Sequence, residues 1–161
     1  MGTQQILIRI IANAIFFLKK KEFEASKLKF LVFTGTVGKT TLRDTVTYAL
    51  KSTSAFVQSN DLGYSNELGI LLTIFGYSQF SFKKPRAWRS LLKSAIPKEG
   101  FVCIELGADF YRDIKWFVKR FSPSAVFISG IVNESWSRNV MEVTKERSFL
   151  LRSIPRSGFL F

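Results

Sequence analysis

The chain contains no histidine and only one cysteine among its 161 residues. The absence of histidine excludes metal sites with imidazole ligands and the Ser-His or Cys-His pairs of nucleophilic catalysis. Cys103, inside the apolar run "FVCIEL", cannot form a disulfide within the chain. We therefore interpret it as a small buried residue of a protein from a reducing compartment.

Long apolar segments are also scarce. The most apolar stretch, Ile6 to Leu18, is interrupted by Arg9 and Asn13, and it is shorter than the about 20 residues of a membrane-spanning helix. Its lysines, at 19–21, follow the apolar residues, whereas those of a signal peptide precede them. Two interpretations remain: a helix that packs on the domain or a neighbour, and an interfacial membrane helix over 6–21. We favour the packing helix, because apolar helical faces are usually core.

Acidic residues are few relative to basic ones. The chain has 12 Asp and Glu against 24 Lys and Arg, which gives a formal net charge of +12. This balance predicts attraction to polyanions such as nucleotides, nucleic acid or anionic lipid, without selecting among them. Hydrophobic residues make up 47% of the chain and charged residues 22%, so we expect a folded globular domain and not a disordered segment.

Short apolar runs rich in β-forming residues alternate with helical stretches along the chain. The runs are "LKFLVFTG", "SAFVQS", "FVCIELG", "SAVFISG" and the terminal "SGFLF", and turn residues or charges bound each of them. Within 109–121, Ile114, Phe117, Val118 and Phe121 recur at helical spacing. The alternation predicts an α/β fold with a mostly parallel sheet flanked by helices, whose ligands bind at the carboxyl ends of the strands.

The segment "FTGTVGKTTLRD" at 33–44 lies between a predicted strand and a predicted helix. Gly35 and Gly38 allow the backbone to curl around an anion. Lys39 supplies a positive charge, and the Thr40 hydroxyl can ligate magnesium. An ordinary P-loop would place its first glycine at position 33, where Phe33 stands. The segment therefore predicts a P-loop NTPase-like phosphate site with a shortened loop.

Glu105 is the second candidate, at the end of the run "FVCIE". An acidic side chain at the end of an apolar strand is costly unless it meets a cation or solvent. If this strand lies beside the phosphate-loop strand, Glu105 suits a magnesium ligand, directly or through water. The alternative is a carboxylate that simply faces water.

The phosphate-loop segment and two later segments of the sequence resemble the Mur ligase family. "TGTVGKTT" is similar to the family signature Thr-Gly-Thr/Ser-x-Gly-Lys-Thr/Ser, and "YSNELGILLTIF" at 64–75 is similar to Asn-Asn-Glu-x-Gly-x-Pro-Leu-Thr, with Leu71 where proline is usual. The segment 103–131 resembles the family's Glu-x-Gly-Ala strand, the helix after it and its Pro-x-x-Ala-Val strand. These matches run in order through 29–161 and are most similar to the D-alanyl-D-alanine-adding branch.

The resemblance implies an ATP- and Mg²⁺-dependent carboxylate–amine ligase of peptidoglycan precursor synthesis in the cytoplasm. In such ligases ATP phosphorylates the carboxylate of a UDP-muramoyl peptide, and the amine of an amino acid or dipeptide attacks the acyl phosphate. The resemblance implies that Thr40 and Glu105 bind magnesium and that Lys39 and Glu105 take part in catalysis. The implied phosphate-binding residues are Gly35, Thr36, Gly38, Lys39, Thr40 and Thr41. The implied residues near the nucleotide are Asn66, Glu67 and Asn133.

Two positions depart from the family pattern. The family usually has a histidine after the Pro-x-x-Ala-Val strand and, later, a lysine that is often carbamylated to bind a second magnesium. Aligned without gaps, these positions fall on Asn133 and Arg147. Asparagine still offers a carbonyl oxygen, but a guanidinium stays protonated and does not readily form a carbamate. Lys145 would replace it only if the register slipped, and it lies on another helical face.

The family pattern also sets the expected domain organisation. Mur ligases have an N-terminal substrate domain, a central ATPase domain and a C-terminal domain. We expect an apolar and basic helix over 1–28 and a central ATPase domain over 29–161 that is incomplete at its C-terminus. Two alternatives stay open: a degenerate, noncatalytic nucleotide-binding module, suggested by Asn133 and Arg147, and an unrelated basic P-loop NTPase that acts on nucleic acid, suggested by the net charge.

Overall fold

The computed structural model describes residues 3–53, 56–60, 66–107, 113–130 and 148–161. In this part of the chain, a five-stranded sheet with the order β2-β3-β1-β4-β5 forms the centre of the molecule, and all its strand pairs are parallel. The strands are β1 (Lys27–Thr34), β2 (Val57–Ser59), β3 (Glu99–Glu105), β4 (Pro123–Ile128) and β5 (Phe159–Leu160). The predicted α/β class is confirmed, and each strand overlaps one of the predicted runs.

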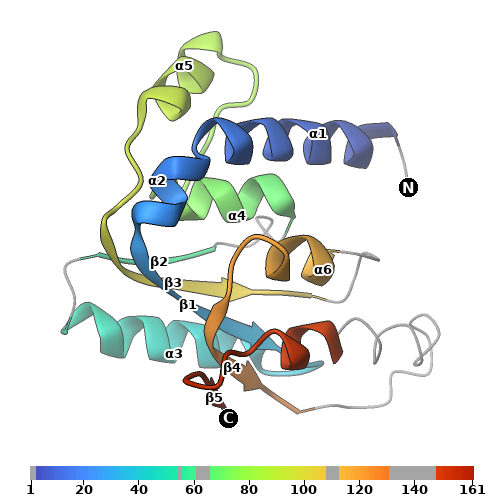
Figure 1. Cartoon of the computed structure of the whole chain (residues 1–161), viewed down its shortest axis with the longest axis vertical. Coiled ribbons are helices and arrows are strands. Elements are labelled where there is room, and N and C mark those ends of the chain that lie inside the picture. Colours follow the sequence, from blue (N-terminus) through green and yellow to red (C-terminus); the bar gives the residue numbers. More distant parts are fainter. Residues whose placement is uncertain (1–2, 54–55, 61–65, 108–112, 131–147) are drawn as a thin grey trace.

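Helices cover both faces of the sheet. They include α1 (Thr3–Leu18), α2 (Lys20–Ala25), α3 (Lys39–Lys51), α4 (Glu67–Ile74), α5 (Pro85–Lys93) and α6 (Asp113–Val118). In Figure 1, α3 lies against one face, α4 and α6 lie on the other, and α1 runs over α4 as a further layer. Within the described residues, the helix predicted in 109–121 ends at Val118 and not at Phe121, because the backbone turns there before it enters β4. None of the described helices has the length and apolar character needed to cross a membrane.

Alternation along β1 divides the core between the two faces of the sheet. Phe30 and Val32 join the larger cluster, under α1, α4 and α6, whereas Leu31 and Phe33 join the smaller cluster that packs on α3. Successive side chains of a strand point to opposite faces, so a strand buried on both faces must be apolar throughout. This explains why β1 reads as a continuous apolar run.

A group of phenylalanine rings ties the N-terminal helices to the sheet. The ring centroid of Phe121 lies 4.9 Å from that of Phe30, 5.3 Å from that of Phe23 and 5.6 Å from that of Phe16. Such edge and tilted contacts add to the free energy of burying the rings. Because Ala12 and Ile15 are also buried in the larger cluster, the inner side of α1 packs on the domain, as the favoured interpretation of the sequence expected.

Polar contacts hold α1 in the same position. Arg9 forms an ion pair with Glu67, the first residue of α4, whose side chain is only 5% exposed. Asn13 Oδ1 accepts hydrogen bonds from Trp116 Nε1 at 2.8 Å and from Arg120 Nη2 at 2.7 Å. A carboxylate as buried as that of Glu67 needs a cation to offset its desolvation. Arg9 supplies this cation, and α1 is thereby tied to α4.

Replacing Glu67 by Ala or Arg9 by Ala is expected to lower the free energy of unfolding by about 2 kcal/mol. Removal of one partner of a fully buried pair costs roughly 3–5 kcal/mol, and the effect is smaller here because the Arg9 side chain stays 21% exposed. Urea denaturation measures it. Glu24→Ala, which breaks only the exposed 3.6 Å pair with Lys20, is the control and should cost less than about 1 kcal/mol. Equal effects at Glu24 and Glu67 would contradict the prediction.

Candidate phosphate and magnesium site

The loop between β1 and α3 has the geometry of a phosphate cradle. Gly38 has φ +79° and lies immediately before the first residue of α3, a left-handed conformation that favours glycine. Gly35 has φ +135°, and a Cβ there would lie 2.3 Å from Ser129 Oγ and 2.6 Å from the Ser129 carbonyl oxygen. The end of β4 therefore leaves no room for a side chain at Gly35. Both glycines of the predicted loop are required by the backbone itself.

Hydrogen bonds to the end of β4 fix the loop. Thr36 N donates to Gly130 O at 2.9 Å, and Ser129 N donates to Thr34 O at 2.9 Å. Beyond the loop, the first turn of α3 directs N–H groups that have no intrahelical acceptor toward the carboxyl end of the sheet. Lys39 Nζ bends back over the loop and donates to Thr36 O at 3.1 Å. This places a positive charge beside a helix N-terminus, an arrangement that favours an anion.

Thr40, in the first turn of α3, meets Glu105 at the end of β3. Glu105 is paired with Phe33 in the parallel register of β1 and β3, so the strand that carries it does lie beside the phosphate-loop strand. Thr40 Oγ1 donates a hydrogen bond to Glu105 Oε2 at 2.8 Å. A hydroxyl and a carboxylate are hard oxygen ligands of the kind that Mg²⁺ prefers. The donor set that the sequence predicted for magnesium is therefore assembled at the carboxyl end of the sheet.

This pair fits a magnesium ion that shares its coordination with phosphate and water. Among the described residues, no group of three or more Cys, Asp or Glu side chains could hold a metal ion by itself. Magnesium at a nucleotide needs no such group, because one or two protein oxygens and the phosphates suffice. The residues present therefore fit MgATP better than a metal bound by protein alone.

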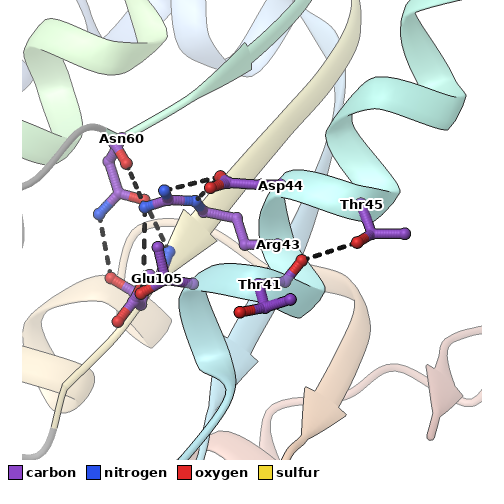
Figure 2. Close-up of polar contacts among 7 residues, drawn as sticks. Thr41, Arg43, Asp44, Thr45, Asn60 and Glu105 are labelled. Carbon is purple, nitrogen blue, oxygen red and sulfur yellow. Dashed lines mark hydrogen bonds and ion pairs between the residues drawn. The ribbon is translucent and has the colours of Figure 1, made fainter.

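Sequence reasoning missed Arg43, which is 5% exposed and lies among Asn60, Asp44 and Glu105 (Figure 2). Its Nη1 donates to the carbonyl oxygen of Asn60 and contacts Glu105 Oε2 at 3.3 Å. Its Nε and Nη2 both donate to Asp44 Oδ1, at 2.8 and 2.7 Å. The guanidinium thus compensates the carboxylate of Glu105, which is 19% exposed. The helical spacing of Thr40, Arg43 and Thr47 could have indicated Arg43 as a site residue, because the three recur on one face of α3.

Asn60 is the second residue that the sequence analysis missed. It follows β2, and its amide spans the end of β3, with Nδ2 donating to Glu105 O at 3.0 Å and Oδ1 accepting from Glu105 N at 2.7 Å. The rule that ligands of a parallel sheet lie where strands end, which selected Glu105, applies equally to Asn60. The amide fixes the backbone of Glu105, and Arg43 holds its side chain.

Asn66 and Glu67, which the family resemblance places near the nucleotide, both have partners within the protein. Asn66 caps α4, with Oδ1 accepting from Gly69 N at 2.8 Å, and Glu67 pairs with Arg9. Thr41 is exposed on the first turn of α3. Asn133 and Arg147 lie outside the described residues. The roles of these residues at a nucleotide stay predictions.

Cys103 does not add a nucleophile to the site. It is buried in β3 under α3, and burial raises the pKa of its thiol. A thiol whose pKa is raised stays protonated at neutral pH, and the thiolate is the reactive form. Cys103 therefore packs as a small apolar residue, as predicted.

Solved structures of much longer enzymes share this fold. A structure of MurF from Acinetobacter baumannii aligns with a TM-score of 0.64 at 20% identity, covering 92% of this chain and 29% of that chain. The UDP-N-acetylmuramoylalanyl-D-glutamyl-2,6-diaminopimelate–D-alanyl-D-alanyl ligase of the same organism aligns with a TM-score of 0.60 at 19% identity, with the same coverage. A second crystal structure of MurF gives 0.51 at 13% identity, over 97% and 29% of the two chains.

These similarities establish the fold, which is that of a segment spanning 29% of the length of those enzymes. No protein-family model matches the sequence, and no curated protein matches it.

Replacing Gly35 by Ala is expected to disrupt the loop much more than replacing Gly38 by Ala. At Gly35 the new Cβ would collide with backbone atoms of Ser129, whereas at Gly38 nothing lies within 4 Å. We expect a loss of about 3 kcal/mol for Gly35→Ala and about 1 kcal/mol for Gly38→Ala, where only the left-handed conformation is penalised. Thermal and urea unfolding measure both. Equal losses at the two glycines would show that β4 does not confine the loop.

Proposed function

We propose that this chain binds MgATP at the loop 34–41 and is the central ATPase domain of a Mur-type ligase. The observation that carries the proposal is the 2.8 Å contact between Thr40 Oγ1 and Glu105 Oε2 beside the N-terminus of α3. A phosphate cradle and a pair of magnesium ligands at the same end of a parallel sheet are what binding of a magnesium nucleotide requires. The fold shared with MurF supports the same assignment.

The residues of the site have separate roles in this proposal. The N–H groups of the loop and of the first turn of α3 orient the phosphates, and Lys39 offsets their negative charge. Thr40 and Glu105 hold magnesium, while Arg43 and Asn60 keep the Glu105 carboxylate and backbone in place. When bound, MgATP supplies the phosphoryl group that activates a carboxylate. The protein contributes by positioning and by electrostatic stabilisation.

The proposed reaction is formation of an amide bond through an acyl phosphate. By the family resemblance, the acceptor carboxylate belongs to a UDP-muramoyl peptide and the amine to an amino acid or dipeptide, and the reaction takes place in the cytoplasm. The ligases with the same fold are much longer than this chain, which spans 29% of their length. We therefore assign the described site to nucleotide binding and activation, and assign both substrates by resemblance alone.

Asn133 and Arg147 favour a second candidate function, which is nucleotide binding without ligation. A guanidinium at the position of the carbamylated lysine would leave the second magnesium without its ligand. The two candidates differ in product and not in nucleotide affinity. MgATP binding without an amide product is also expected of a ligase domain tested alone, because this chain spans 29% of the length of those ligases. The discriminating experiment restores histidine and lysine in an Asn133→His/Arg147→Lys variant and adds the other ligase domains. ATP hydrolysis by that assembly supports the ligase domain, whereas its continued absence supports the noncatalytic module.

Calorimetric titration of MgATP tests the proposed site. The unaltered chain is expected to bind, and Lys39→Ala should weaken binding by about tenfold or more, because a charged contact to phosphate is lost. Lys51→Ala is the matched control, since Lys51 is an exposed lysine at the other end of α3, and its affinity should match that of the unaltered chain. Circular dichroism establishes that all three proteins are folded.

Two results would contradict the proposal. One is the absence of any MgATP binding by the folded, unaltered chain. The other is an equal affinity of the Lys39→Ala and Lys51→Ala variants, which would place the nucleotide away from the loop.

A further inference from the structure

The orientation of α1 is inverted relative to that of an ordinary surface helix. Between residues 6 and 18, its exposed side chains are all apolar: Ile6, Leu7, Ile10, Ala14, Phe17 and Leu18. Its two polar residues in this range point inward, where Arg9 pairs with Glu67 and Asn13 accepts from Trp116 and Arg120. A helix on a water-exposed surface places its polar residues outward. The sequence of α1 therefore suits a helix with protein on one side and an apolar phase on the other.

The exposed apolar residues form one continuous face. Ile6, Ile10 and Phe17 recur at spacings of four and seven residues, which place them on one side of a helix. They are 47%, 59% and 65% exposed, and Leu18 reaches 71%. Contiguous apolar surface of this kind usually marks an interaction site. We call the six exposed residues from Ile6 to Leu18 the outer face of α1.

A pocket continues the outer face at its C-terminal end. It has a volume of about 570 Å³, and Phe16, Phe17, Phe23 and Phe121 line it. Phe17 belongs both to the outer face and to the pocket. The charged side chains of the lining are Lys20, Lys119 and Arg120 against the single carboxylate of Glu24. The apolar surface thus ends in an aromatic pocket whose charged groups are mostly cations.

The charges around this surface select the partner. Three lysines, Lys19, Lys20 and Lys21, directly follow the outer face. Lys19 pairs with Glu22 at 2.7 Å and Lys20 with Glu24 at 3.6 Å. Three positive charges against two negative ones leave this segment with a net positive charge. The chain as a whole carries a formal charge of +12. An apolar helical face bordered by lysines matches the boundary between acyl chains and anionic headgroups.

We propose that the outer face of α1, together with the adjoining aromatic pocket, docks on the surface of a membrane that contains anionic phospholipid. The apolar side chains would enter the boundary between headgroups and acyl chains, and the basic residues would lie among the lipid phosphates. The ion pair of Arg9 with Glu67 and the contacts of Asn13 keep α1 attached to the domain. The helix therefore lies along the membrane with the domain above it. This inference does not depend on the proposed function.

Vesicle flotation with the full chain tests the proposal. The chain should float with vesicles made of equal parts phosphatidylglycerol and phosphatidylcholine, and much less with phosphatidylcholine alone. Binding should fall as salt is raised, because screening weakens attraction to the anionic lipid. The Ile10→Ser/Phe17→Ser double variant should lower the vesicle partition coefficient by about tenfold or more, since two large apolar side chains are lost.

Tyr48→Ser is the matched control. Tyr48 is 82% exposed on α3, which covers the opposite face of the sheet from α1 (Figure 1), and its removal should leave flotation unchanged. Because all three substituted positions are exposed, each variant should unfold at nearly the same temperature as the unaltered chain. Lys39→Ala, which tests the nucleotide site, should float normally, so failure of one proposal is distinguishable from failure of the other.

Three results would overturn the membrane proposal. The first is no flotation with either vesicle, and the second is flotation that the Ile10→Ser/Phe17→Ser variant retains in full. The third is a dimer in light scattering that this variant abolishes while vesicles are not bound. That last result would show that a second copy of the chain covers the outer face.

Discussion

The side chain of Arg43 joins the three segments that make up the site. It reaches from α3 to the carbonyl oxygen of Asn60 after β2 and to the carboxylate of Glu105 at the end of β3. A buried guanidinium without partners is very costly, so its position is coupled to the positions of all its acceptors. The site therefore depends on one residue that need not itself touch a nucleotide. The placement of Glu105 relative to the loop before α3 follows from this charge and its partners.

Local sequence determines the parts of the structure that were predicted correctly. The strands are short apolar runs bounded by turn residues, and the buried parallel sheet requires this pattern. Gly35 and Gly38 were predictable because the backbone needs a close approach and a left-handed conformation at those positions. The placement of Glu105 beside the loop followed from the parallel pairing of β1 and β3, which the alternation of strands and helices predicted.

The residues that were missed act through contacts distant in sequence. Arg43 meets Glu105 and Asn60 across the sheet, and Arg9 meets Glu67 across two helices. The spacing of Arg43 with Thr40 and Thr47 points to one face of α3, but it does not identify the partners of Arg43 on other segments. The buried side of α1 could not be predicted for a similar reason, because an apolar stretch with two polar residues does not reveal which side of the helix is buried. Only the partners of Arg9 and Asn13 show that the polar side faces inward and the apolar side faces out.

The central claim is that Arg43 holds Glu105 ready for magnesium, and the magnesium dependence of ATP binding in an Arg43→Met variant tests it most directly. Calorimetry with Mg²⁺ and with EDTA gives the gain in ATP affinity due to the metal. We predict that Arg43→Met keeps the ATP affinity measured in EDTA and loses most of the increase in affinity that Mg²⁺ gives. Arg43→Lys should lie between Arg43→Met and the unaltered chain, because lysine keeps the positive charge but lacks the planar guanidinium. An undiminished gain in folded Arg43→Met would contradict the account.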